Sequence, residues 1–197
     1  PVLMAWVENL VAAREVYCLH PYFGGLGESF SFQPRGLFYQ LKPCAASVLE
    51  EGPLPPEALA ENRAFWQAFL SKSLPELVRH IPSPEQLAHQ PRSLQRHHLK
   101  AYREPERDPW VVVVAAFYAR ALDTWGVELQ KAGLLREAGD CFAAALQLSP
   151  DNVAAQINCA FNQDLQAHKP VAIQSAQQIE ARLGKRRSWS QILDTDG

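Results

Sequence analysis

A histidine and a glycine cluster near the N-terminus are the first candidates for binding a small ligand. His20 ends a short β-type stretch, and the loop behind it contains Gly24, Gly25 and Gly27. Strand ends in α/β units often hold ligands, and glycine-rich loops can cradle phosphate groups. The cluster lacks both the GxGxxG and the GK[ST] pattern, and a strand is expected to follow it rather than a helix. We therefore favour a flexible loop beside a structural histidine, with a stand-alone enzyme or ligand-binding domain using this rim as the alternative.

A basic segment from Arg92 to Arg107 is the second candidate. Its basic residues are Arg92, Arg96, His97, His98, Lys100, Arg103 and Arg107. Such a run can contact the phosphates of nucleic acid or of anionic lipid. Glu104, Glu106 and Asp108 interrupt or follow it, and the chain has a net charge of −2. Nucleic-acid surfaces normally make the whole domain basic, so we expect a solvated connector and no nucleic-acid partner, with lipid or nucleic-acid binding as a weaker alternative.

The cysteines and the remaining polar residues offer no recognisable chemistry. The four cysteines are Cys18, Cys44, Cys141 and Cys159, and none forms a CxxC pair. HxxxH and HExxH spacings are also missing from the sequence, so a zinc site is not expected. Cys141 and Cys159 fall at helical positions that suit small residues, which favours buried free thiols. No Ser–His–Asp or Cys–His set has local support, and we expect no catalytic residues, metal or cofactor.

The most informative pattern lies between Leu122 and Asn152. Its diagnostic residues are Trp125, Gly126, Leu129, Gly133, Ala138, Phe142, Ala145 and Pro150. The small residues allow two helices to approach closely with Phe142 between them, and Gly133 suits a left-handed C-cap. This spacing matches the tetratricopeptide (TPR) repeat, a helix–turn–helix unit of about 34 residues. We place the TPR-like repeat at 119–152 and a partial second repeat at 153–167.

A TPR array usually binds its partners on a concave face, which its first helices line. The residues expected there by spacing are Asp123, Val127, Gln130, Lys131, Ile157, Asn158, Phe161 and Asp164. This mixed set provides no cationic clamp for a peptide carboxylate. The face could equally pack against the N-terminal part of the same chain.

The first 43 residues are expected to form a helix followed by three strands. Apolar residues recur with helical spacing from Val2 to Arg14. The expected strands lie at 15–20, 29–33 and 37–42, with a turn at 34–36. We interpret 1–43 as a small α/β cap that is the tail of a larger unit, and the proline-rich residues 44–56 as a connector.

Residues 57–197 are predicted to be helical, which makes the chain mainly α with a small α+β component. A helix over 56–71 should bury Phe65 and Trp66, and Ser73 should cap a separate short helix. Asp108-Pro109 opens a long helix to Lys131, whose apolar beginning is expected to be buried between neighbours. Its longest apolar run, Trp110 to Ala119, is shorter than the roughly 18 residues of a membrane span. Two further helices are expected after Pro170.

Several phrases taken in order resemble a family of large bacterial membrane proteins. They are EVYCLHPYF, FSFQPRGLFYQLKP, ENRAFWQAF, the TPR-like unit and LGKRRSWSQILDTDG. The family is similar to the protein O-mannosyltransferases, and its members carry several membrane spans followed by TPR repeats. The resemblance covers most of the chain and is most specific in the PRGLFYQLKP segment.

The resemblance implies that this chain is the soluble C-terminal region of a longer parent. The membrane portion would precede Pro1, and further repeats would follow Gly197. No catalytic residue of the family maps onto this sequence. The parent is expected in the bacterial inner membrane with this region extracytoplasmic, although four unpaired-looking cysteines fit poorly with an oxidising compartment. The function expected is a non-catalytic scaffold that binds a protein or peptide, or the rest of its own parent chain.

Overall fold

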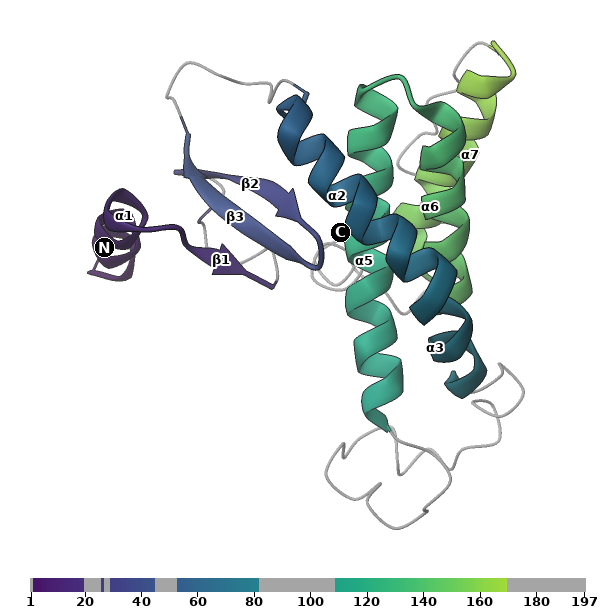
Figure 1. Cartoon of the computed structure of the whole chain (residues 1–197), viewed down its shortest axis with the longest axis horizontal. Coiled ribbons are helices and arrows are strands. Elements are labelled where there is room, and N and C mark those ends of the chain that lie inside the picture. Colours follow the sequence, from purple (N-terminus) through teal and green to yellow (C-terminus); the bar gives the residue numbers. More distant parts are fainter. Residues whose placement is uncertain (1, 20–25, 27–28, 45–52, 82–108, 170–197) are drawn as a thin grey trace, which may run out of the picture.

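The computed structural model describes residues 2–19, 26, 29–44, 53–81 and 109–169 (Figure 1). Within them the chain is mainly helical and contains one small antiparallel sheet of three strands. The predicted rim of His20, Gly24, Gly25 and Gly27 lies outside the described residues. So do the basic segment 92–107 and the helices predicted after Pro170.

The N-terminal part pairs one helix with the sheet, as expected. Helix α1 (Val2–Ala13) precedes β1 (Tyr17–Cys18), β2 (Phe30–Arg35) and β3 (Phe38–Pro43), and the strand order is β1-β3-β2. Both strand pairs are antiparallel. The described strands therefore differ from the parallel sheet that characterises an α/β unit.

The β2–β3 hairpin turns at Gly36 and Leu37, whereas the sequence pattern placed the turn at 34–36. Pro34 lies inside β2 and pairs with Tyr39, and Arg35 pairs with Phe38. Gly36 has a φ of 61°, which fits the glycine-first two-residue turn that hairpins prefer. Side chains on one face of the sheet then meet α1, where Val7, Phe30 and Leu41 are buried together.

Helix α2 (Pro56–Ala68) does not stop before the next helix. It passes through a π-helical turn, η2 (Phe69–Ser73), directly into α3 (Leu74–His80), as the bent path in Figure 1 shows. Ser73 has helical dihedral angles and makes no side-chain cap, so its predicted role as an N-cap is wrong. The π turn keeps the backbone hydrogen-bonded where two separate helices had been expected.

Three antiparallel helices follow, α5 (Pro109–Lys131), α6 (Leu135–Leu148) and α7 (Val153–Gln166). A Cβ atom placed on Gly126 would lie 2.4 Å from Phe142 Cε1, so glycine is needed where α5 crosses α6. Gly133 has a φ of 77° at the end of α5, which confirms its predicted capping conformation. Asn152 caps α7 by accepting a hydrogen bond from Ala155 N at 2.8 Å.

The buried part of the helical region is the C-terminal half of α5 and its neighbours. Leu122, Trp125 and Leu129 pack there with Phe142 of α6 and Trp66 of α2. The expectation that the apolar start of α5 would be buried is wrong, because Trp110 is 65% exposed and Val112, Val113 and Val114 are also exposed. Phe65, also expected to be buried, is 42% exposed beside the hairpin turn at Gly36.

Among the described residues, one helix meets the length and hydropathy of a membrane span, α5 over Trp110–Lys131. A core helix of a globular protein meets the same test. Helix α5 carries the buried charged residues Arg120, Asp123 and Glu128, and it contacts α6 extensively. Its C-terminal half is thus a core helix of this fold.

Candidate interaction surface

Helices α5 and α7 are held in register by polar side chains of the predicted surface. Asn158 Nδ2 donates hydrogen bonds to both carboxylate oxygens of Asp123, at 3.1 and 3.0 Å. Gln130 Nε2 donates to Asn162 Oδ1 at 3.2 Å, two turns further along α5. Asn162 Nδ2 donates in turn to the carbonyl oxygen of Leu135 at the start of α6. These side chains fix how the two helices lie against each other.

The other predicted surface residues are arranged around these pairs. Val127, Ile157 and Asp164 are half-buried, and Lys131 is exposed. Lys131 Nζ forms an ion pair with Glu128 of its own helix at 2.7 Å. Phe161 is 39% exposed and is the large apolar residue of the set that remains accessible. The structure therefore brings Asp123 and Asn158 into contact and leaves Phe161 partly exposed.

The sequence interpretation missed two charged residues on α5. Arg120 lies one turn before Asp123 and is only 5% exposed, with its guanidinium 5.8 Å from the centre of the Phe117 ring. Glu128, the partner of Lys131, is also buried. Helical spacing from Asp123 would have found Arg120, because residues three apart share a helix face.

The N-terminal sheet reaches α5 next to this surface. The Tyr39 hydroxyl lies 3.0 Å from Thr124 Oγ1, adjacent to Asp123 in the chain. Burial raises the pKa of Tyr39 to about 12, so the hydroxyl keeps its proton and its hydrogen bond at neutral pH. The cap thus contacts α5 at Thr124, which is not one of the residues predicted for the interaction face.

Asn62 of α2 fastens the hairpin to the helices, a role that the sequence did not reveal. Its Nδ2 donates to the carbonyl oxygens of Pro34 and Ala58, at 2.9 and 2.8 Å. Its Oδ1 accepts from Gly36 N at 2.7 Å. The side chain is buried and uses its hydrogen-bonding capacity on backbone groups of the turn and of its own helix.

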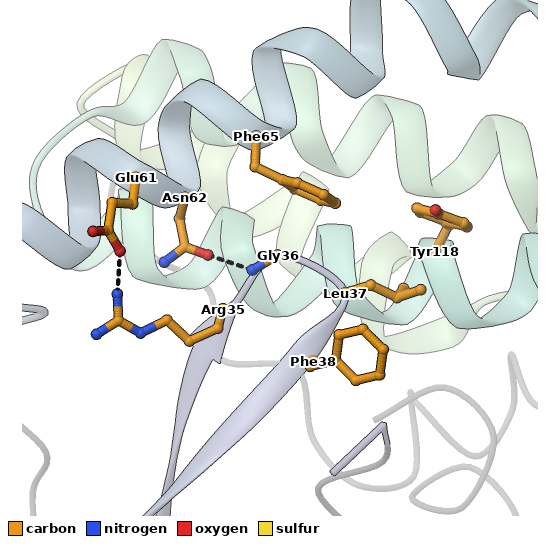
Figure 2. Close-up of a pocket in the computed structure, with 8 residues that line it drawn as sticks. All are labelled: Arg35, Gly36, Leu37, Phe38, Glu61, Asn62, Phe65 and Tyr118. Atoms are coloured by element: carbon orange, nitrogen blue, oxygen red, sulfur yellow. Dashed lines mark hydrogen bonds and ion pairs between the residues drawn. The ribbon is translucent and has the colours of Figure 1, made fainter. Parts of the chain in front are cut away.

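A pocket of about 320 Å³ opens where the hairpin tip meets α2 and α5. Figure 2 shows its lining residues, which are Arg35, Gly36, Leu37, Phe38, Glu61, Asn62, Phe65 and Tyr118. Phe65, Leu37, Phe38 and Tyr118 gather at one end, while the Arg35–Glu61 ion pair lies at the other. Its volume is at the lower end of the range for small ligand sites.

The described part of the chain contains no group of three His, Cys, Asp or Glu side chains placed to hold a metal ion. Cys141 is buried, and burial raises the pKa of its thiol to about 12. A thiol with such a pKa stays protonated at neutral pH and is a poor nucleophile. Cys141 therefore acts as a small core residue, as its repeat position predicted.

Comparison with known proteins identified no relative, since no family model, curated protein or solved structure matches this chain. The family resemblance thus rests on the sequence phrases alone. Function has to be inferred from the contacts described above.

Proposed function

We propose that this chain is a non-catalytic protein-interaction module with a TPR-like helical unit at its centre. The observation that carries the proposal is the α5–α7 surface, where polar pairs join the two helices and Phe161 of α7 is 39% exposed. Its ligand would be an extended segment of a protein partner.

Support for the TPR-like unit comes from the packing of α5 against α6. The Gly126–Phe142 approach, the fully buried Ala138 and Ala145, and the Gly133 cap all occur at the positions of the repeat pattern. Helix α7 then follows as the first helix of the partial second repeat. In such an array, the first helices of adjacent repeats form the binding surface.

Support for a protein partner comes from the character of this surface. Aromatic side chains that remain accessible beside satisfied polar groups are common anchors in protein interfaces. Lys131 is exposed but already pairs with the Glu128 carboxylate, and Arg120 is buried, so neither is placed to bind a peptide carboxylate. We therefore expect recognition through an apolar side chain of the partner rather than through its C-terminal carboxylate.

The test is selection of binders from a random peptide library, followed by affinity measurements with variants. Phe161→Ala should lower the affinity for the selected peptide at least tenfold, because the substitution removes the exposed aromatic anchor. Tyr17→Ala is a matched control, since Tyr17 is an exposed aromatic residue on the distant β1 strand. A selected peptide that binds Phe161→Ala and wild type equally would contradict the assignment of this surface.

We further propose, from the sequence resemblance, that the chain belongs to a membrane glycosyltransferase-like parent of the bacterial inner membrane and lies outside the cytoplasm. An antibody against this chain, used on fractionated native cells, tests that placement. A large protein in the membrane fraction would support it. A soluble protein near 22.0 kDa would contradict it and would redirect attention to His20 and its glycine loop.

A further inference from the structure

The pocket at the hairpin tip has an apolar end and an ion pair at its other end (Figure 2). We propose that it binds an aromatic ring linked to a polar group that is neutral overall and carries both a hydrogen-bond donor and an acceptor, as in an aromatic amino acid. The ring would occupy the apolar end, and the polar group would face Arg35 and Glu61. The lining shares no residue with the α5–α7 surface, so this site does not depend on the proposed function.

The rings at the apolar end are held in place by buried aromatic neighbours. Tyr118 stacks on Phe69, with ring centroids 4.3 Å apart and an angle of 7° between the ring planes. The Phe65 ring meets the Trp66 ring edge to face, at a centroid distance of 5.0 Å. Because Phe69 and Trp66 belong to the core, the pocket is already formed, and binding requires little ordering of these side chains.

The exposed rings favour an aromatic ligand over an aliphatic one. Phe38 and Phe65 both line the pocket and are 49% and 42% exposed. A ligand ring can form with them the offset-stacked or edge-to-face contacts that aromatic pairs prefer, and these contacts contribute beyond the area that they bury. An aliphatic group of equal size would bury the same surface without that contribution.

The polar end offers a free donor and a free acceptor on two paired side chains. Arg35 Nη1 donates to Glu61 Oε2, and Arg35 Nε donates to Gln40 Oε1 at 3.4 Å. Within the described residues, Arg35 Nη2 and Glu61 Oε1 have no hydrogen-bond partner. An amide group can accept a hydrogen bond from the first of these atoms and donate one to the second.

The same ion pair disfavours ligands with a single net charge. A carboxylate beside Arg35 would also face Glu61, and an ammonium beside Glu61 would also face Arg35. A neutral amide, or a zwitterion with one charge of each sign, avoids this repulsion. The preference should be only about threefold, because 29% of the Arg35 side chain and 69% of the Glu61 side chain are exposed to solvent that screens their charges.

Titration of the whole chain with N-acetylphenylalanine amide, followed by proton–nitrogen NMR correlation spectra, tests the proposal. The Gly36 amide is the reporter, because it lies in the pocket wall and donates to Asn62 Oδ1. A ligand of this size with ordinary binding energy per atom should have a dissociation constant on the order of 1 mM. N-acetylalanine amide, which lacks the ring, should bind at least tenfold more weakly. N-acetylleucine amide should bind about threefold more weakly.

Charged analogues test the role of the ion pair. Hydrocinnamate and phenethylammonium keep the ring but carry one charge, so each should bind about threefold more weakly than the neutral amide. Glu61→Gln leaves the Arg35 charge unopposed, so hydrocinnamate should then bind more tightly than phenethylammonium. Glu57→Gln is the matched control, because Glu57 is exposed one turn earlier on α2 and does not line the pocket.

Free phenylalanine, which is a zwitterion at neutral pH, identifies the source of the ligand. Tighter binding of free phenylalanine than of the blocked amide would indicate a free amino acid. Tighter binding of the blocked amide would indicate an aromatic residue within a peptide.

Substitution of a pocket ring gives the decisive comparison. Phe38→Ala should weaken the blocked amide at least fivefold, and the dispersion of the same spectra shows that the variant is folded. Tyr17→Ala is the matched control, because Tyr17 is an exposed aromatic residue that does not line the pocket. A Gly36 amide signal that does not move at about 10 mM probe would overturn the proposal. So would equal binding of the phenylalanine and alanine amides, or a Glu61→Gln variant that does not change the order of the charged probes.

Discussion

The two halves of α5 show the reverse of the burial that their hydropathy predicts. The N-terminal half begins with Trp110 and four valines, and its exposed residues are Trp110, Val112, Val113 and Val114. The C-terminal half contains Arg120, Asp123 and Glu128, and all three are buried. The difference shows that the hydropathy of a helix segment does not determine whether the segment is buried. Burial depends on which neighbouring elements pack against it.

The physical reason is the unequal length of the helices. Helix α5 has 23 residues and α6 has 14, so α6 covers only the C-terminal part of α5. Figure 1 shows the N-terminal end of α5 continuing beyond the end of α6. Buried charges in the covered half are tolerated because they find partners, as Asp123 does with Asn158.

The largest expected effect is a loss of folding stability. It is tested by replacing one apolar residue in each half of α5. Leu122→Ala should destabilise the fold by about 2–5 kcal/mol, because Leu122 is completely buried and its loss leaves a cavity. Val113→Ala on the exposed half should change the free energy of unfolding by at most about 0.5 kcal/mol. Urea denaturation measures both, and equal losses would refute the difference between the two halves.

The covered half can also be disturbed by adding a single methyl group. Gly126→Ala should cost about 1–3 kcal/mol, since its Cβ would overlap the Phe142 ring unless the helices separate. The same change combined with Phe142→Leu should cost less than the sum of the two single changes. Additive losses in this double-mutant cycle would show that the two residues do not compete for the same space.

An effect of similar size is expected where the cap joins the helices. Asn62→Ala should destabilise by about 1–3 kcal/mol, because it leaves Gly36 N and the Pro34 carbonyl without their side-chain partner. Asn9→Ala on the exposed side of α1 serves as the control. Hydrogen exchange of the Gly36 amide should accelerate in Asn62→Ala, and unchanged protection would contradict the assigned role of Asn62.

The smallest effect at neutral pH concerns Cys141 in the covered half. Its pKa is raised from an ordinary 9.0 to about 12 by burial, so the folded state favours the protonated thiol. The stability from this group is complete below pH 9 and is lost as pH rises toward 12. Cys141→Ala should show a weaker decline of stability over that interval than wild type, and parallel pH profiles would argue against this titration.

The sequence anticipated the elements more successfully than the surfaces. The long helix, the Gly133 cap, the stop at Pro150 and the three strands follow from local propensity, and all appear in the structure. The continuous path through Phe69–Ser73 was missed, because Ser73 two residues before Pro75 is a local start signal that the tertiary packing overrode. Asn62 was missed because its partners lie 26 and 28 residues away along the chain.

The contacts among the residues of the predicted interaction surface could not be predicted for the same reason. Helical spacing placed Asp123 and Asn158 on related faces, but it could not show that they bind each other. Helical spacing also did not show which apolar residue of the surface would stay exposed. The exposure of Phe161 could be seen only with α5 and α7 packed side by side. The predicted His20 rim belongs to residues that the structure does not describe.

By itself, the sequence determined the limits of α5 and α6 and their close crossing, because glycine, proline and small residues act through local geometry and short spacing. Only the tertiary structure decided which surfaces are covered. Burial of Arg120 and exposure of Trp110 depend on where α6, α2 and the hairpin end in space, and no local pattern encodes that distance.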